Sequence, residues 1–309
     1  MRIAVIGVGA VGGYFGGRLA EAGEDVTFVA RGATLEALEA KGLIVESING
    51  DFTINPARTT SDPAIVGPVD LVLFGVKAWQ LAEAARSGLP MFGPDTVALP
   101  LQNGVEGPEA LAGVVGRHRV LGGLCKIFVQ VAEPGHIRHL GVEPSIDFGE
   151  LDGHVSPRAE AIRAAFEAAG VRIRIAEHIE AAMWEKFLFI VATSAVGAVT
   201  RATLGELREV PESRAVLEES MREIWRLARA RDVPVTDGIV DRVMAFVDGL
   251  PEEATASMQR DIMAGRPSEL EAQSGAVVRL AAEVGFDVPV NSVLYGALLP
   301  AELKARGAA

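Results

Sequence analysis

The chain has 309 residues and a formal net charge of −12, with 49% hydrophobic and 23% charged residues. This composition excludes the disordered class, and the length is enough for about two domains of the usual ~150 residues each. The acidic charge argues against a nucleic acid or an anionic membrane as partner, because binding phosphates requires clustered Lys and Arg.

Apolar runs alternate with helix-like stretches through the first half of the chain. The N-terminus, MRIAVIGVGA, enters a strand pattern at once and lacks the basic and apolar regions of a signal peptide. The runs expected to form strands are Arg2–Ile6, Val26–Ala30, Val69–Val76, Thr96–Leu101 and Val120–Val131, and the expected helices are Val11–Ala22 and Thr34–Ala40. Buried parallel strands have continuous hydrophobic sequences, so this pattern predicts a doubly wound α/β sheet.

The turn after the first strand has the pattern G-x-G-x-x-G. It consists of Gly7, Val8, Gly9, Ala10, Val11 and Gly12. The pattern follows a predicted strand and opens a helix, which is the context that a dinucleotide fingerprint requires. Gly7 permits the tight turn, Gly9 lets the backbone approach a pyrophosphate, and Gly12 allows close packing of helix and strand. We therefore expect these six residues to bind a dinucleotide cofactor, the alternative being a glycine-rich turn without a ligand.

Arg31 ends the second predicted strand, VTFVARG, where an NAD site would carry an acidic residue. That acid would bond to the ribose hydroxyls, whereas a guanidinium can bind a 2′-phosphate in bidentate fashion. The sequence therefore favours NADP(H) over NAD(H), with a solvated loop charge as the alternative for Arg31.

Two later strands also end in polar residues. Lys77 closes LVLFGVK, and Asn103 with Gly104 closes LQNG. Ligands of α/β sheets bind at the C-terminal ends of the strands, so two such residues predict a shared pocket. The alternatives are an ordinary strand-end lysine and a tight Asn-Gly turn.

Helical periodicity dominates from Ile179 onward. The expected helices are Ile179–Val199, Arg214–Arg231, Val235–Val247, Ala254–Met263 and Ser268–Val284. We expect a Rossmann-type α/β domain over residues 1–176 and an all-helical domain over 177–309. The first helix is either internal core or part of a homodimer surface. No run reaches the ~18 uninterrupted apolar residues of a membrane span, so we expect a soluble, cytoplasmic protein.

The segment WEKFLFIVATS places a lysine beside an almost entirely apolar run. In a helix, Lys186, Ile190 and Ser194 lie on one face. Partial burial lowers the pKa of a lysine toward the working range of an acid, and a carboxylate such as Glu269 would orient the lysine and oppose that shift. The alternative, which the sequence alone favours, is a surface Glu185–Lys186 pair beside a core helix.

Metal ligands are not expected. Cys125 is the only cysteine, so no intramolecular disulfide can form, and the five histidines show no convincing ligand spacing.

Together these residues resemble the ketopantoate reductase (2-dehydropantoate 2-reductase) family along essentially the whole chain. The matching segments are GVGAVG at 7–12, Arg31, VKAWQ at 76–80, LQNG at 101–104, WEKF at 184–187, GEL at 205–207, SMQRDIMAGRPSELE at 257–271, GFDVP at 285–289 and Asn291. The resemblance implies a Rossmann domain, a helical domain of the 6-phosphogluconate dehydrogenase C-terminal type, and a substrate cleft between them. It also implies NADPH-dependent reduction of a small-molecule 2-keto acid.

By position, the resemblance assigns roles to single residues. Lys186 would be the general acid that protonates the carbonyl oxygen, and Glu269 would position that lysine. Lys77 and Asn103 would contact the nicotinamide end of the cofactor and the reacting groups. Ser257 would bind the substrate carboxylate.

Three positions depart from the family pattern. The family usually carries Asn four and eight residues after the lysine, and another directly before Gly-Glu-Leu, where this chain has Ile190, Ser194 and Leu204. Those amides bind polar groups of the substrate, including a hydroxyl of ketopantoate. Ile190 cannot form such a bond, and a desolvated hydroxyl left unpaired costs ~1–3 kcal/mol.

Three functions follow from these observations. The first is reduction of 2-dehydropantoate to (R)-pantoate in pantothenate and coenzyme A synthesis. The second is a reductase or D-2-hydroxyacid dehydrogenase for a more apolar, branched or aromatic 2-keto acid. The third is a non-catalytic NADP-binding sensor, which would have no need for Lys186 and Glu269.

Overall fold

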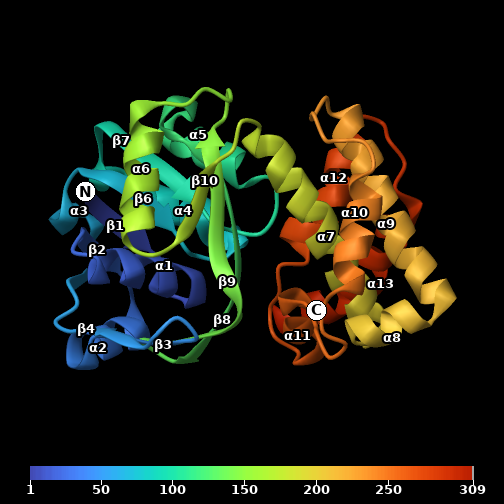
Figure 1. Ribbon diagram of the computed structural model, residues 1–309, viewed down its shortest axis with the longest axis horizontal. Helices are drawn as coiled ribbons and strands as arrows, with labels where there is room; N and C mark the ends of the chain where they lie inside the picture. Colours follow the sequence, from blue (N-terminus) through green and yellow to red (C-terminus); the bar gives the residue numbers. More distant parts are fainter. Residues whose placement is uncertain (308–309) are drawn as a thin grey trace. The chain divides into compact units, whose positions relative to one another are not determined.

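The computed structural model describes residues 1–307, which form two compact units (Figure 1). The first unit comprises Met1–Gln102 and Gly107–Ile179. The second comprises Asn103–Glu106 and the chain from Glu180 onward. The division after Ile179 lies close to the domain boundary expected at 176/177, which stays a prediction. The assignment of residues 103–106 to the second unit is not expected from the sequence.

Five parallel strands form the first sheet, in the order β5-β2-β1-β6-β7. They are β1 (Arg2–Ile6), β2 (Asp25–Val29), β5 (Thr59–Thr60), β6 (Val69–Phe74) and β7 (Phe92–Pro100). One face packs on helix α1 (Ala10–Glu21), and the other packs on α4 (Leu81–Ser87) and α5 (Gly107–Val115), with a hydrophobic core on each side. The expected Rossmann-type unit is therefore confirmed.

A second sheet accompanies the first. Its strands are β3 (Leu43–Ser47), β4 (Phe52–Ile54), β8 (Leu121–Glu133), β9 (His136–Glu150) and β10 (Arg172–Ile175). The sequence predicts the run at 120–131 as part of the parallel sheet. Val120 does form an isolated parallel bridge with Ala98 of β7, but the rest of the run lies in β8 and pairs with β9 in antiparallel fashion, so the prediction is wrong for that part. An apolar run reports burial and carries no information on the direction of the partner strand. The chain reverses at Pro134-Gly135, where Gly135 has φ 74°.

Helix α1 contacts strands of both sheets, and glycines on two of its faces allow this. A Cβ on Gly16 would lie 2.8 Å from Cγ2 of Val5 in the first sheet. A Cβ on Gly13 would lie 2.9 Å from Cγ1 of Ile137 in the second sheet. A methyl group at either position would be too close to the strand, so the two glycines allow the helix to approach both sheets. The remaining α-helices of the unit are α2 (Gly32–Lys41), α3 (Pro63–Val66) and α6 (Pro157–Ala168).

The second unit is built from helices. They are α7 (Ile179–Thr200), α8 (Leu204–Glu209), α9 (Pro211–Ala230), α10 (Ile239–Asp248), α11 (Ser257–Met263), α12 (Ala276–Glu283) and α13 (Pro289–Ala305). This confirms the expected helical character, although α8 and α13 are not expected. The helix predicted over 268–284 begins three residues later, and its first turn, Glu271–Gly275, is π-helical and runs directly into α12.

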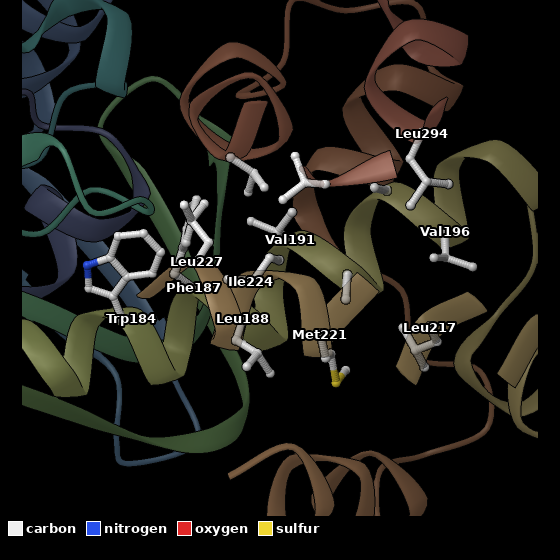
Figure 2. Packing of buried hydrophobic residues seen from close by; sticks show 14 of the residues in the cluster. Trp184, Phe187, Leu188, Val191, Val196, Leu217, Met221, Ile224, Leu227 and Leu294 are labelled. Atoms are coloured by element: carbon white, nitrogen blue, oxygen red, sulfur yellow. The ribbon is translucent and has the colours of Figure 1, made fainter. Parts of the chain in front are cut away.

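Helix α7 is the centre of this unit. Figure 2 shows Trp184, Phe187 and Val191 among the buried side chains that pack with residues of α9 and α13. By length and composition alone α7 could cross a membrane, but 67% of its most apolar window is buried inside the protein. Of the two interpretations of this helix, the internal core accounts for most of its length.

Candidate active site

The glycine turn lies between β1 and α1 in the first unit. Gly7 has φ +91°, and a Cβ there would lie 2.6 Å from the Val76 backbone nitrogen. A Cβ on Gly12 would lie only 2.1 Å from the Gly7 carbonyl oxygen. A Cβ on Gly9 would have no atom of the described residues within 4 Å, apart from its chain neighbours. Two of the three glycines are therefore required by packing, whereas Gly9 leaves its backbone open to a ligand.

The start of α1 adds hydrogen-bond donors to this turn. Gly9 is the N-cap, and no side chain within residues 1–307 caps the helix. The first N–H groups of a helix have no partner within it, and the helix dipole favours an anion there. Val8 is buried in the core and offers only its backbone. The residues of this turn therefore fit the diphosphate of a dinucleotide.

Arg31 follows β2 and is the N-cap residue of α2. Its side chain is exposed, and within residues 1–307 it forms neither a hydrogen bond nor an ion pair. The guanidinium is thus available to an anionic ligand of the first unit.

Lys77 is exposed and follows β6, with its ammonium 5.9 Å from the centre of the Trp79 ring. Next to it, the Gln102 amide donates to the carbonyl oxygens of Phe74 (2.8 Å) and Val76 (2.9 Å). Gln102 therefore fixes the turn that packs against Gly7. Sequence reasoning missed this residue, although its place in LQNG at a strand end was a usable signal. The shared pocket of Lys77 and Asn103 stays a prediction.

The second unit brings together three of the predicted residues. Nζ of Lys186 donates to Oδ1 of Asn103 at 2.9 Å, and Nδ2 of Asn103 donates to Oε2 of Glu269 at 3.3 Å. Glu269 is buried and Lys186 is half-buried. Asn103 bonds to both side chains, a link that the sequence does not reveal. Glu185, which the alternative interpretation pairs with Lys186 at the surface, accepts a hydrogen bond from Thr236.

The predicted substrate-binding residues have different environments. Ile190 is half-buried and packs against the core of the second unit, one turn beyond Lys186 on α7. Ser194 is buried on the same helix, and Leu204 is a core residue at the start of α8. Ser257 is exposed as the first residue of α11.

A second polar network supports the segment that carries Asn103. Arg279 donates to Glu106 at 2.8 Å and to the Glu271 side chain at 3.2 Å. Tyr295 donates to Glu271 at 2.6 Å, and burial together with this bond raises the pKa of Tyr295 to about 12. The phenol therefore keeps its proton at neutral pH. These residues come from distant segments, and no local pattern marks them.

Comparison with known proteins identifies a family that spans most of the chain. The ketopantoate reductase PanE/ApbA family model matches residues 3–153, and the model of its C-terminal part matches residues 178–302. The chain is 29% identical to an uncharacterized oxidoreductase, YkpB, of Bacillus subtilis, over 96% of this chain and 98% of the relative.

Two solved structures extend the comparison. A 2-dehydropantoate 2-reductase from Geobacter metallireducens is 33% identical, with a TM-score of 0.91, over 97% of this chain and 100% of the other. D-mandelate dehydrogenase, solved with NADH and anilino(oxo)acetate, shares the fold with a TM-score of 0.90 at 18% identity, over 99% and 100% of the two chains. Since both family models match and together cover most of its length, the protein is an oxidoreductase that belongs to the ketopantoate reductase family.

Proposed function

We propose that the protein reduces a 2-keto acid to the 2-hydroxy acid with NADPH, and that this acid is 2-dehydropantoate, giving (R)-pantoate. The observation that carries the proposal is the hydrogen-bonded set of Lys186, Asn103 and Glu269 in a member of this reductase family. The reaction would serve pantothenate and coenzyme A synthesis in the cytoplasm.

In this mechanism the chemistry that a bound nicotinamide would supply is a hydride for the carbonyl carbon. Lys186 gives a proton to the carbonyl oxygen as negative charge develops there. A cation aimed at a developing alkoxide stabilises the transition state more than the ground state, so it raises the rate and not only the affinity.

Asn103 and Glu269 direct that proton donor. The carboxylate accepts only from the NH₂ side of the Asn103 amide, which turns the amide oxygen toward Lys186. One N–H of the ammonium is then engaged by the amide. Glu269 thus orients the lysine through the amide.

The cofactor proposal rests on the glycine turn and on Arg31. Gly9 and the start of α1 would hold the diphosphate, with Lys77 contributing near the nicotinamide end. The exposed guanidinium of Arg31 would bind the 2′-phosphate, which NADH lacks. This supports NADPH, although a neighbour of the same fold was solved with NADH.

A second candidate function is reduction of a more apolar 2-keto acid. It is favoured by Ile190, an apolar and half-buried side chain one turn from Lys186. In either case Ser257 would bind the substrate carboxylate, since its hydroxyl lies at an exposed position.

A substrate panel tests both candidates. The purified protein would be assayed by nucleotide absorbance with NADPH and with NADH, against 2-dehydropantoate, a branched aliphatic 2-keto acid and an aromatic one. The highest kcat/KM with 2-dehydropantoate supports the first function. Much faster turnover of an apolar acid would support the second function in place of the first. No reduction of any acid would favour the non-catalytic NADP-binding sensor.

A further inference from the structure

A buried carboxylate of the last helix holds the residue directly before Glu269. Glu302, on α13, is only 1% exposed. Both of its oxygens lie 3.1 Å from the Ser268 backbone nitrogen, and Oε2 accepts from the Ser268 hydroxyl at 2.5 Å. Ser268 itself is fully buried.

Arg306 completes this contact. Its Nε donates to Oε1 of Glu302 at 2.5 Å, and its Nη2 donates to the Ser268 carbonyl oxygen at 2.8 Å. The Ser268 hydroxyl also accepts from the Leu270 N–H at 3.2 Å. The N–H, the C=O and the hydroxyl of Ser268 are therefore all engaged. This arrangement also explains why the predicted helix does not begin at Ser268.

The fixed position of Ser268 matters because the next residue, Glu269, accepts the hydrogen bond from Asn103. The Asn103–Glu269 distance of 3.3 Å is already at the long end for a hydrogen bond. A shift of a few tenths of an ångström in the Glu269 backbone would break it. A buried charge is costly unless it is paired. The bonds from the Glu302 carboxylate to Ser268 therefore hold this residue in a defined position.

We propose that Glu302 is a positioning residue, which clamps Ser268 and thereby sets Glu269 to orient Asn103 and Lys186. The effect on turnover rests on the proposed function, in which Lys186 is the proton donor. The fixed position of the segment around Glu269 does not depend on the proposed function.

A matched pair of variants tests this role. Glu302→Gln removes the charge and turns one acceptor into a donor that faces Ser268. Glu223→Gln is the control, because Glu223 is equally buried and accepts the backbone N–H groups of Val290 and Asn291 at the other end of α13. Both variants should lose stability, so activity is compared at a temperature where both are folded.

We expect Glu302→Gln to lower kcat by roughly 10- to 100-fold, the scale of a small misplacement of catalytic groups, with the Kd for NADPH unchanged. Amide hydrogen exchange should accelerate at residues 268–275 in this variant and not in Glu223→Gln. If Glu302→Gln does not fold, Ser268→Ala, which removes only the hydroxyl, should show the same two effects at smaller size.

An equal loss of kcat in the Glu302 and Glu223 variants would overturn the proposal. If the unaltered protein reduces no keto acid, the proposed function fails on its own account. The clamp is then judged by hydrogen exchange, and equal exchange at residues 268–275 in both variants would overturn it.

Discussion

Replacing Gly9 with alanine should separate folding from cofactor binding. Gly9 has φ −86° and ψ −157°, outside the left-handed region, so alanine can adopt its backbone conformation. Apart from its own chain neighbours, the added methyl would meet no atom of residues 1–307 within 4 Å. Alanine is a poorer N-cap by up to about 1 kcal/mol, but it also restricts the unfolded chain by about 0.4–1 kcal/mol. The free energy of unfolding without cofactor should therefore change little.

The same methyl should weaken cofactor binding. It fills the space through which a pyrophosphate would reach the backbone N–H groups of the turn. Losing one hydrogen bond to a charged group costs about 1.5–3 kcal/mol. Because 1.4 kcal/mol is a factor of ten, the Kd for NADPH should rise roughly 10- to 100-fold.

Gly12→Ala provides the contrast. Its Cβ would lie 2.1 Å from the Gly7 carbonyl oxygen, and backbone cannot move aside as a flexible side chain can. This variant should lose about 1–3 kcal/mol or more of stability before any cofactor is added. Urea denaturation without cofactor and fluorescence titration with NADPH measure the two effects. Unchanged NADPH affinity in Gly9→Ala would refute the assignment of this turn to the diphosphate.

Three other changes give distinct results. Arg31→Ala should weaken NADPH binding by about 1.5–3 kcal/mol and leave NADH binding nearly unchanged; an equal loss for both cofactors would show that Arg31 does not bind the 2′-phosphate. Lys186→Ala should lower turnover by several orders of magnitude with nearly unchanged NADPH affinity, and a rate within tenfold of the original would rule out its role as the acid. Gly16→Ala should destabilise the protein by about 1–2 kcal/mol in urea, since overpacking outweighs helix propensity, while Gly113→Ala, whose methyl meets nothing within 4 Å, should not. Equal stability of these two variants would contradict the close packing of α1.

The first sheet and its glycine turn could be predicted because each depends on local sequence. The run Arg2–Ile6 is a strand with the expected bounds, and the helix after Gly9 begins at the next residue. The roles of Gly7 and Gly12 also follow from the motif, because the tight turn and the close helix–strand contact are general features of it. Here local pattern and tertiary structure agree.

The second sheet was harder to predict from local sequence. Its hairpin turn, Glu133-Pro134-Gly135-His136, carries the Pro-Gly signal of a chain reversal, which was available in the sequence. The glycines of GGYFGG in α1 were a further signal, because small residues on two faces of a helix permit two close neighbours. The length of β9, 15 residues, had no comparable local marker.

The proposed catalytic residues could be named only through family resemblance. Lys186 lies 83 residues from Asn103, and Glu269 lies 166 residues from it. Periodicity places Lys186 on a helix face but does not say what meets that face. The clamp on Ser268 is even less visible, since a glutamate and an arginine four apart on a helix are read as an ordinary surface pair.

Of the three departures from the family pattern, one bears most on which 2-keto acid the protein reduces. Leu204 lies in the hydrophobic core, where burying such a side chain stabilises the fold by about 1.5–3 kcal/mol, so stability alone explains an apolar residue there. Ser194 is buried but keeps a hydroxyl, which can still donate and accept. Ile190 is only half-buried, gains less from burial, and offers no hydrogen bond at all. A preference for an apolar acid in the substrate panel would therefore point first to Ile190, whereas efficient reduction of 2-dehydropantoate would mean that its hydroxyl finds a partner elsewhere.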